Sequence, residues 1–211
     1  MPRTRVFDEG KVLEATMLTF WKNGYEATSI QMLEQETGLK RTSLYNAYGN
    51  KRDLFTRSLM LYLDEFLTSF LTAIEEAPTA KQAVEAVLNE TIKLHFKPSH
   101  PGGCMIVLSL LESHQHDTDT RLLVEQALEQ LRDGLCKRFI EAVKVADLPP
   151  DTNCEIVADE VIALITGTIV MAKANISKDR LEAMIALTSS TILPAGTMQD
   201  AMTSGSSAGS L

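Results

Sequence analysis

The sequence predicts an all-α protein of about nine helices, in which a three-helix N-terminal domain precedes a larger helical domain. Apolar residues recur at helical spacing along most of the 211 residues, whereas the alternation typical of strands is nearly absent. Several segments open with Ser, Thr, Asp or Asn followed three residues later by Asp, Glu or Gln, the pattern of a helix N-cap. Gly and Pro separate these segments, so the helix ends can be placed as well.

The first fifty residues predict three short helices joined by tight turns. Asp8 has the position of an N-cap for the first helix, which is expected to end near Gly24. Thr28 and Gln31 form a capping box for the second helix, and Gly38 can take the left-handed conformation that ends it. We therefore expect a compact helical domain at the N-terminus.

The third helix, residues 41–48, has one apolar face and one polar face. Leu44 and Tyr48 lie one turn apart and are expected to face the core. The outer face carries hydrogen-bonding side chains, which are Arg41, Thr42, Ser43, Tyr45 and Asn46. Two short helices with a glycine turn between them and such an outer face have the layout of a helix-turn-helix, whose second helix enters the major groove of DNA.

The net charge of −8 is unevenly distributed along the chain. Residues 1–60 hold nine Lys and Arg against seven Asp and Glu, whereas residues 61–211 hold eleven against twenty-one. The charge that attracts phosphates is therefore on the N-terminal segment. Because the excess is small, we expect modest and salt-dependent affinity for DNA of any sequence.

A long helix from Lys51 to Glu76, capped by Asn50, is expected to connect the two domains. Its early residues Leu54 and Phe55 can pack beneath the helix-turn-helix. Its later apolar residues are expected in a separate core, and these are Leu59, Leu63, Phe66, Leu67, Phe70 and Ile74.

The domain boundaries follow from this reading of the helices. Residues 1–50 are expected to form the helix-turn-helix domain, residues 51–194 a larger helical domain whose regulatory and dimerisation roles are argued below, and residues 195–211, rich in Gly and Ser, a disordered tail. Apolar residues lie almost all round the segment 104–114, which predicts a buried helix. The other helices of the second domain are expected at residues 80–96, 118–146, 153–175 and 178–193, with caps at Thr79, at Asp117 or Thr118, at Thr152 and at Ser177.

Composition excludes several classes of protein. No apolar run approaches the roughly 20 residues of a membrane helix, and Arg3 and Arg5 interrupt any apolar core of a secretory signal. We therefore expect a soluble, cytoplasmic protein with no membrane partner. An odd number of cysteines without close pairing indicates free thiols, and these are Cys104, Cys136 and Cys154.

Unusual residue choices agree with one known pattern over about fifty positions of the N-terminal segment. They are Gly24-Tyr25, Thr28-Ser29-Ile30, Gly38-Leu39, Ser43-Leu44-Tyr45, Tyr48, Asn50-Lys51 and Leu54-Phe55. With this spacing, residues 8–58 resemble the DNA-binding domain of the TetR family of bacterial transcription regulators. The remaining chain matches that family in helix number and order, and Gly103-Cys104-Met105 through Glu112 is similar to a segment found in part of it. The chain departs from the family at Lys40, Thr42 and Ala47, which leaves the operator sequence open.

The resemblance implies a regulator of transcription, most often a repressor, in which Thr28, Tyr45 and Lys51 contact phosphates of a double-stranded operator. The free amides and dipole of a helix N-terminus at Thr28 favour an anion for physical reasons too. Arg41 is the best candidate for reading a base, because a guanidinium can pair with both acceptors of guanine. The short polar side chains suited to base edges or phosphates are Thr42, Ser43 and Asn46. The alternative is that all of these are ordinary solvated residues.

One recognition helix makes few base contacts, so useful specificity requires a homodimer on a roughly palindromic operator. The last two helices carry apolar stripes that can pair with a second copy as a four-helix bundle. We expect the dimer interface to contain Val157, Val161, Leu164, Gly167, Thr168, Met171, Leu181, Met184, Ile185 and Thr188. The alternative is that these stripes pack inside one subunit.

By resemblance, the second domain binds a small-molecule effector that moves the long helix and changes the spacing of the two recognition helices. Such coupling requires only that effector and DNA prefer different conformations. The side chains expected around the effector are Phe66, Phe70, Cys104, Val107, Leu111 and Phe139. They are apolar, which favours a hydrophobic effector, and the alternative is that they are plain core residues.

Cys104 supports a second hypothesis, in which an oxidant or electrophile controls the repressor. The thiol follows two glycines at the start of a helix, where the dipole favours the thiolate. Metal sensing is a further alternative, because the four histidines fall in the same region, namely His95, His100, His114 and His116. A buried apolar cysteine among surface histidines is the plain alternative.

An enzyme is the alternative from a different class. The sequence has no nucleophile–base constellation, no glycine-rich phosphate loop and no spaced metal-ligand motif on one helix. We therefore expect no catalytic activity, no cofactor and no metal, with an all-α enzyme using Cys104 and His100 as a remote alternative. Sequence-specific retention on its own upstream DNA would separate a regulator from an enzyme.

Overall fold

The computed structural model describes residues 7–193, and within this range it consists of helices and their connections, so the all-α prediction is confirmed. In chain order the elements are α1 (Glu9–Ala27), α2 (Ile30–Thr37), α3 (Arg41–Tyr48), α4 (Lys51–Glu75), α5 (Ala80–Phe96), α6 (Met105–Leu111), the 3-10 turn η1 (Ser113–Gln115), α7 (Thr118–Lys144), α8 (Cys154–Lys173) and α9 (Lys178–Thr188). The basic residues Arg3 and Arg5 and the predicted tail 195–211 lie outside the described residues.

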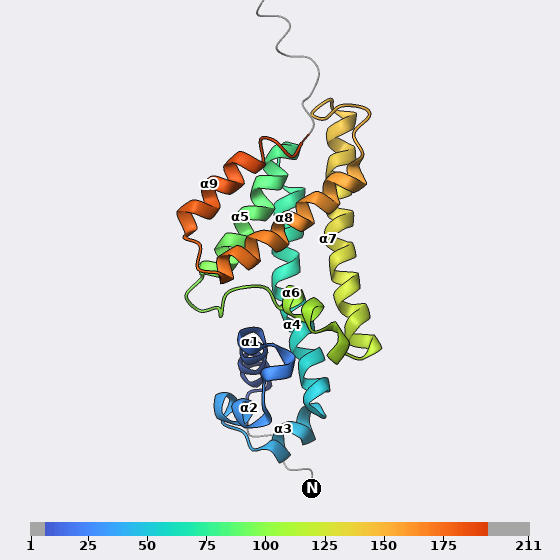
Figure 1. Ribbon diagram of the computed structural model, residues 1–211. Coiled ribbons are helices and arrows are strands. Elements are labelled where there is room, and N and C mark those ends of the chain that lie inside the picture. Colours follow the sequence, from blue (N-terminus) through green and yellow to red (C-terminus); the bar gives the residue numbers. More distant parts are fainter. Residues whose placement is uncertain (1–6, 194–211) are drawn as a thin grey trace, which may run out of the picture.

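The helices form an elongated molecule with the first three at one end (Figure 1). In this view α1, α2 and α3 lie together at the lower end, and α4 runs from them into the upper bundle. Helices α5 and α9 lie on one side of the upper part, α7 flanks the other side, α8 crosses between them, and α6 lies where the two parts meet. No helix in the described range has an apolar stretch long enough to cross a membrane.

Most of the predicted helix starts are confirmed by capping hydrogen bonds. The side chain of Asn50 accepts hydrogen bonds from the amides of Arg52 and Asp53, at 2.8 and 3.2 Å. The Asp53 carboxylate accepts one from the Asn50 amide at 2.8 Å, which completes the predicted capping box of α4. A side chain that accepts hydrogen bonds from backbone amides also caps α1, α5 and α7, and the capping residues are Asp8, Thr79 and Asp117.

Two predicted caps are wrong by one residue. Helix α2 is capped by Ser29, whose Oγ accepts a hydrogen bond from the amide three residues on at 3.2 Å. Thr28 does not cap it, because this residue is buried and its hydroxyl donates to the carbonyl of Gly24 at 2.6 Å. Helix α8 is likewise capped by Asn153 rather than by Thr152.

The core between α1 and α4 is aromatic. Trp21 contacts Tyr62 and Phe66, with ring centroids 4.9 and 5.3 Å apart, and Phe20 meets the edge of Phe55 at 5.1 Å. All five rings are buried. Because aromatic pairs at such distances add to the energy of burial, this cluster fixes α1 firmly on α4.

Helix α4 passes from this core to the second one later than predicted. Leu59, Leu63 and Phe66 belong to the aromatic core, and Ile74 near the end of α4 belongs to the second core. The prediction for the first three was wrong because α6 and α7 reach down and cover them. The covering side chains are Met105, Val124 and Ala127.

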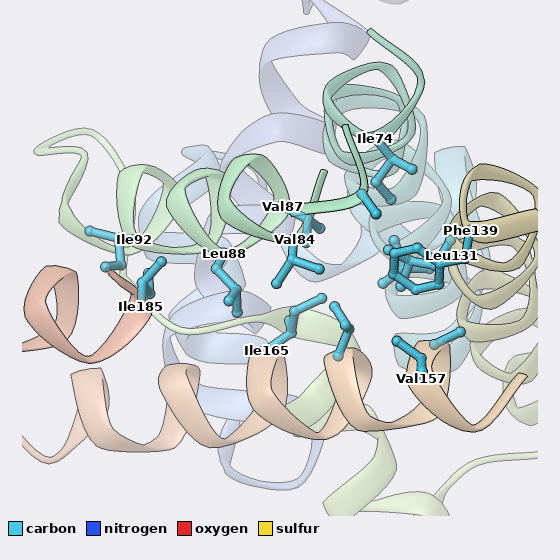
Figure 2. Packing of buried hydrophobic residues seen from close by; sticks show 14 of the residues in the cluster. Ile74, Val84, Val87, Leu88, Ile92, Leu131, Phe139, Val157, Ile165 and Ile185 are labelled. Atoms are coloured by element: carbon cyan, nitrogen blue, oxygen red, sulfur yellow. The ribbon is translucent and has the colours of Figure 1, made fainter. Parts of the chain in front are cut away.

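The second core lies among α5, α7, α8 and α9 (Figure 2). Val84 and Leu88 of α5 point toward Ile165 of α8, and Phe139 of α7 lies near Val157 of the same helix α8. The apolar stripe of α8 therefore faces α5 and α7 of its own subunit.

The prediction of a buried helix over residues 104–114 is wrong in part. Helix α6 has seven residues, and only Met105 and Ser109 among them are buried. Leu111 is 72% exposed. The chain turns through η1 into α7 at this point, so the outer side of α6 is not covered by any residue of the described range 7–193.

Candidate nucleic-acid interface and effector cavity

The turn between α2 and α3 is fixed by backbone conformation and by one carboxylate. Gly38 has φ of 68°, as predicted for the residue that ends α2. Lys40 precedes α3 without a side-chain cap. The carboxylate of Glu34 in α2 caps α3 instead, since this carboxylate accepts a hydrogen bond from the Arg41 amide at 2.7 Å. This contact sets the angle between the two helices.

The polar face of α3 has the orientation that the sequence predicts. Leu44 and Tyr48 are buried, and the Tyr48 hydroxyl donates to the carbonyl of Glu9 at 3.1 Å. The guanidinium of Arg41 lies over the ring of Tyr45, 5.1 Å from its centroid, which limits the conformations of both side chains. The predicted residues of this helix are all at least partly exposed, namely Arg41, Thr42, Ser43, Tyr45 and Asn46.

Lys51, at the start of α4, is held against the end of α1. Its Nζ lies 4.5 Å from the centroid of the Tyr25 ring and donates to the carbonyl of Glu26 at 3.4 Å. Burial lowers the pKa of Lys51, and the charges of Glu26 and Glu112 oppose that shift. A phosphate beside the ammonium would favour its charged form further.

Thr28, the remaining predicted phosphate contact, is not on the surface. Its side chain is buried and its hydroxyl is engaged within α1, so the half-buried Ser29 takes the position at the start of α2. Helix α1 is interrupted at Gly24, and the helical turn after this glycine continues to Ala27. Thr28 therefore ends α1, and the cap of α2 lies one residue later than the sequence pattern predicts.

A cavity of about 50 Å³ lies among α4, α5, α6, α7 and α8. Four of the six residues predicted around an effector line it: Phe66, Phe70, Cys104 and Val107. The prediction is wrong for Leu111, which faces outward, and for Phe139, which is completely buried in the second core. No side chain in the wall is charged, and its hydroxyl groups belong to Tyr62, Thr91 and Thr166.

The surroundings of Cys104 disfavour the thiolate that the sequence predicts. Burial raises the pKa of the Cys104 thiol, although the hydrogen bond from the Tyr62 hydroxyl to Sγ, at 3.4 Å, opposes the shift. The helix that follows has about two turns, and burial outweighs the hydrogen bonds from the amides of Ile106 and Val107, which also oppose the shift. The hypothesis of an oxidant or electrophile sensor at Cys104 stays a prediction, and it requires the thiolate, which burial disfavours.

The histidines have separate structural partners. The amide of Gly103 donates to Nδ1 of His95 at 2.8 Å, His100 packs on Trp21, and His116 stacks on Phe55. Burial lowers the pKa of all three rings. Among the described residues no group of three or more His, Cys, Asp or Glu side chains is placed to hold a metal ion.

Two stretches of the chain match known families. Residues 12–57 match the bacterial regulatory proteins of the tetR family, and residues 80–188, about half of the chain, match the tetracyclin repressor-like C-terminal domain. The chain belongs to the TetR family. The first stretch contains the helix-turn-helix described above, and the second contains α5, α6, α7 and α8, which enclose the cavity together with α4. A TetR-family protein of this kind is a DNA-binding transcriptional regulator, and the resemblance seen in residues 8–58 is confirmed.

Similar proteins are TetR-type regulators over nearly their whole length. The uncharacterized regulator YezE of Bacillus subtilis is 29% identical over 183 residues, which is 86% of this chain and 94% of YezE. The transcriptional repressor ComR of Escherichia coli is 27% identical over 85% of this chain and 86% of its own. A cysteine mutant of the TetR-family regulator CifR, solved with 26 bp of double-strand operator DNA, is 28% identical with a TM-score of 0.82, covering 91% of this chain and all of that one.

The predicted dimer stripes of this TetR-family chain are only partly exposed. Five of the ten residues are buried inside the subunit, so the prediction is wrong for Val157, Val161, Thr168, Leu181 and Ile185. Leu164, Met171, Met184 and Thr188 are half-buried, and Gly167 is exposed. Periodicity identified the apolar face of each helix correctly, but that face covers α5 and α7.

A different face of α8 and α9 is apolar and open. We call it the outer α8–α9 face, and it contains Ile156, Ala163, Gly167, Val170 and Leu187. Its α8 members recur at seven-, four- and three-residue steps, so they form one stripe along that helix. Ile156 and Val170 are each about half exposed, and Leu187 is 70% exposed.

Proposed function

We propose that this chain is a dimeric repressor that binds a roughly palindromic operator and is released by a small, uncharged, apolar effector. The observation that carries the proposal is the uncharged cavity, because its wall includes α4, the helix that begins at the DNA face. ComR, a similar protein of comparable length, is named a repressor, which favours repression over activation.

In this proposal each polar side chain on the outer face of α3 has a role in binding DNA. Arg41 reads a base edge in the major groove, since it stands in the first turn of α3. Tyr45 and Lys51 contact phosphates on either side of it. Ser29, half-buried at the start of α2, takes the phosphate contact expected of Thr28. The short polar side chains Thr42, Ser43 and Asn46 contact neighbouring bases or phosphates.

The operator activity is testable with DNA from immediately upstream of the protein's own coding sequence. Full-length protein should retard that fragment and leave an unrelated fragment of equal length free in a mobility-shift assay. Deleting the gene should raise transcription from the same promoter if the protein represses. Lower transcription after deletion would instead identify an activator, and no retardation at all would reject the operator.

The effector must enlarge its cavity in order to bind. The present volume of about 50 Å³ holds about one or two waters, whereas small-molecule sites are usually several hundred Å³. Entry of the effector therefore pushes apart α4 and α6. If the effector binds this expanded conformation more tightly than the DNA-binding one by about 1–3 kcal/mol, its binding weakens the affinity for DNA. The charge-free wall excludes an ionised effector, because an unpaired charge there would be strongly disfavoured.

The outer α8–α9 face is the proposed dimer interface, and Gly167 provides its test. A Cβ built on Gly167 meets no atom within 4 Å in the subunit, so a large side chain fits without disturbing the fold. In a dimer the same side chain would hold the two α8 helices apart. Gly167→Trp should therefore give a folded monomer by light scattering at a concentration where the wild type is dimeric.

Gly167→Ala is the matched control for that experiment. It adds one methyl group, improves helix propensity by about 1 kcal/mol, and should leave the dimer intact. A Gly167→Trp variant that stays dimeric would contradict this interface. Unfolding of Gly167→Trp at a temperature where Gly167→Ala is folded would contradict the open space around the residue.

A further inference from the structure

We propose that Glu112 is a positioning residue for the DNA-binding face, and this proposal rests on the operator-binding function above. Glu112 follows α6 and belongs to the regulatory part of the chain. Its carboxylate accepts a hydrogen bond from the Tyr25 amide at 2.8 Å and another from the Glu26 amide at 3.1 Å. These contacts join residues 87 and 86 positions apart, and each oxygen takes one amide.

The two amides are available because α1 is interrupted at Gly24. The glycine has φ of 81° and ψ of 173°, so the amides that follow it leave the helical hydrogen-bond pattern. Successive amides after such a residue form a concave site that favours an anion. In this chain the anion is a side chain of the same molecule.

Gly24 is fitted to the carboxylate in a second way. A Cβ at this position would lie 2.7 Å from one oxygen of Glu112 and 3.0 Å from the other. Any side chain would therefore displace Glu112, in addition to straining the backbone at positive φ. Backbone conformation and close approach thus require glycine independently.

The carboxylate also organises the cation that faces DNA. Tyr25 and Glu26, whose amides it holds, supply the ring and the carbonyl against which Lys51 packs. Glu112 is in addition one of the two negative charges that favour the protonated form of Lys51. Loss of Glu112 would release the corner between α1 and α2, and with it the position of Lys51.

Other contacts secure the same junction without reaching this corner. Asp117 forms an ion pair with Arg52 at 3.5 Å, and Thr120 and Thr56 share a hydrogen bond of 3.0 Å. These pairs join the start of α7 to the first turns of α4. Within residues 7–193, Glu112 is the residue whose side chain accepts hydrogen bonds from the amides of Tyr25 and Glu26.

Helix α6 links this contact to the cavity. Cys104, Ile106 and Val107, at its first turn, line the cavity wall, and Glu112 follows its last turn. The seven residues between span about 10 Å, which a helix of this kind crosses as a rigid rod. An effector that pushes α6 outward would withdraw the carboxylate from the two amides. We therefore infer that release from DNA proceeds through Glu112.

Glu112→Gln separates this role from a general effect of charge. Removing a negative charge from a DNA-binding protein should by itself strengthen binding. The amide side chain, however, presents an NH₂ group to one of the two backbone amides and cannot accept its hydrogen bond. We expect operator affinity to fall about tenfold, the usual scale for a hydrogen bond to a charged group. Glu125→Gln, an exposed glutamate of α7, is the matched control and should bind as tightly as the wild type or more tightly.

Amide hydrogen exchange tests the contact without DNA. In Glu112→Gln one of the two amides, that of Tyr25 or that of Glu26, should exchange about tenfold faster, while the aromatic core stays protected. Unchanged exchange at both amides, or undiminished operator affinity in a variant that folds, would overturn the proposal. If the variant unfolds, Glu112→Asp decides it by the same exchange measurement. If the wild type binds no upstream DNA, the operator function fails, and exchange alone still decides the role of Glu112.

Discussion

Replacing Arg41 by alanine should weaken operator binding by about 1–3 kcal/mol per half-site and should reduce discrimination at one base pair. The side chain is exposed in the first turn of α3, and its guanidinium is held over Tyr45, so little freedom is lost when it pairs with a base. Binding of fluorescent operator DNA, repeated with each base substituted in turn, measures both quantities.

Lys51→Ala is the comparison variant for this experiment, because Lys51 is the proposed phosphate contact. A phosphate contact carries no sequence information, so this variant should weaken binding to every sequence alike and make the dependence on salt less steep. The two variants are expected to differ in kind. Loss of discrimination in Lys51→Ala, or equal losses on all sequences in Arg41→Ala, would mean that α3 enters the groove in another orientation.

Phe139→Ala should lower the free energy of unfolding by about 3–5 kcal/mol. The ring is completely buried among α5, α7 and α8 (Figure 2), so its removal leaves an apolar cavity that the neighbours cannot close. Leu111→Ala is the matched control from the same predicted group of ligand contacts. It lies at the surface, and its effect should stay within about 0.5 kcal/mol.

Denaturant unfolding followed by circular dichroism measures both variants under the same conditions. A small loss in Phe139→Ala would mean that the second core is loosely packed or can collapse around the gap. A loss of several kcal/mol in Leu111→Ala would mean that the outer side of α6 is covered in solution, for example by another subunit. Either outcome would change the assignment of the cavity walls.

Local features of the fold could be predicted because their causes are local. The box formed by Asn50 and Asp53 and the left-handed Gly38 depend on residues within a few positions of each other, and both are confirmed. The prediction that Thr28 caps α2 was wrong, because the position of this cap depends on where α1 is interrupted. A shift of one residue in that interruption exchanges a buried hydroxyl for a capping one.

Burial was harder to predict, because periodicity identifies an apolar face and not what covers it. The stripe through Val157 and Val161 was assigned to a partner subunit, and it faces the subunit's own second core. Leu111 and Val107 are both apolar, yet of the two only Val107 lines the cavity. Leu111 is the last residue of α6, where the chain turns away from the cavity. The contacts of Glu34 and Glu112 had no signal in sequence, because a solvated carboxylate and one that accepts backbone amides look alike there.

The path of α4 through both cores limits how this protein can be rebuilt. A fragment ending near residue 50 would leave Phe20 and Trp21 without their ring partners Phe55, Tyr62 and Phe66, and should not fold independently. A chimera that joins this operator specificity to another protein's sensor must therefore exchange at a point beyond Phe66. It must also retain the α6 and α7 side chains that close the aromatic core, so the helix-turn-helix and the helices around the cavity share one core and are not interchangeable modules.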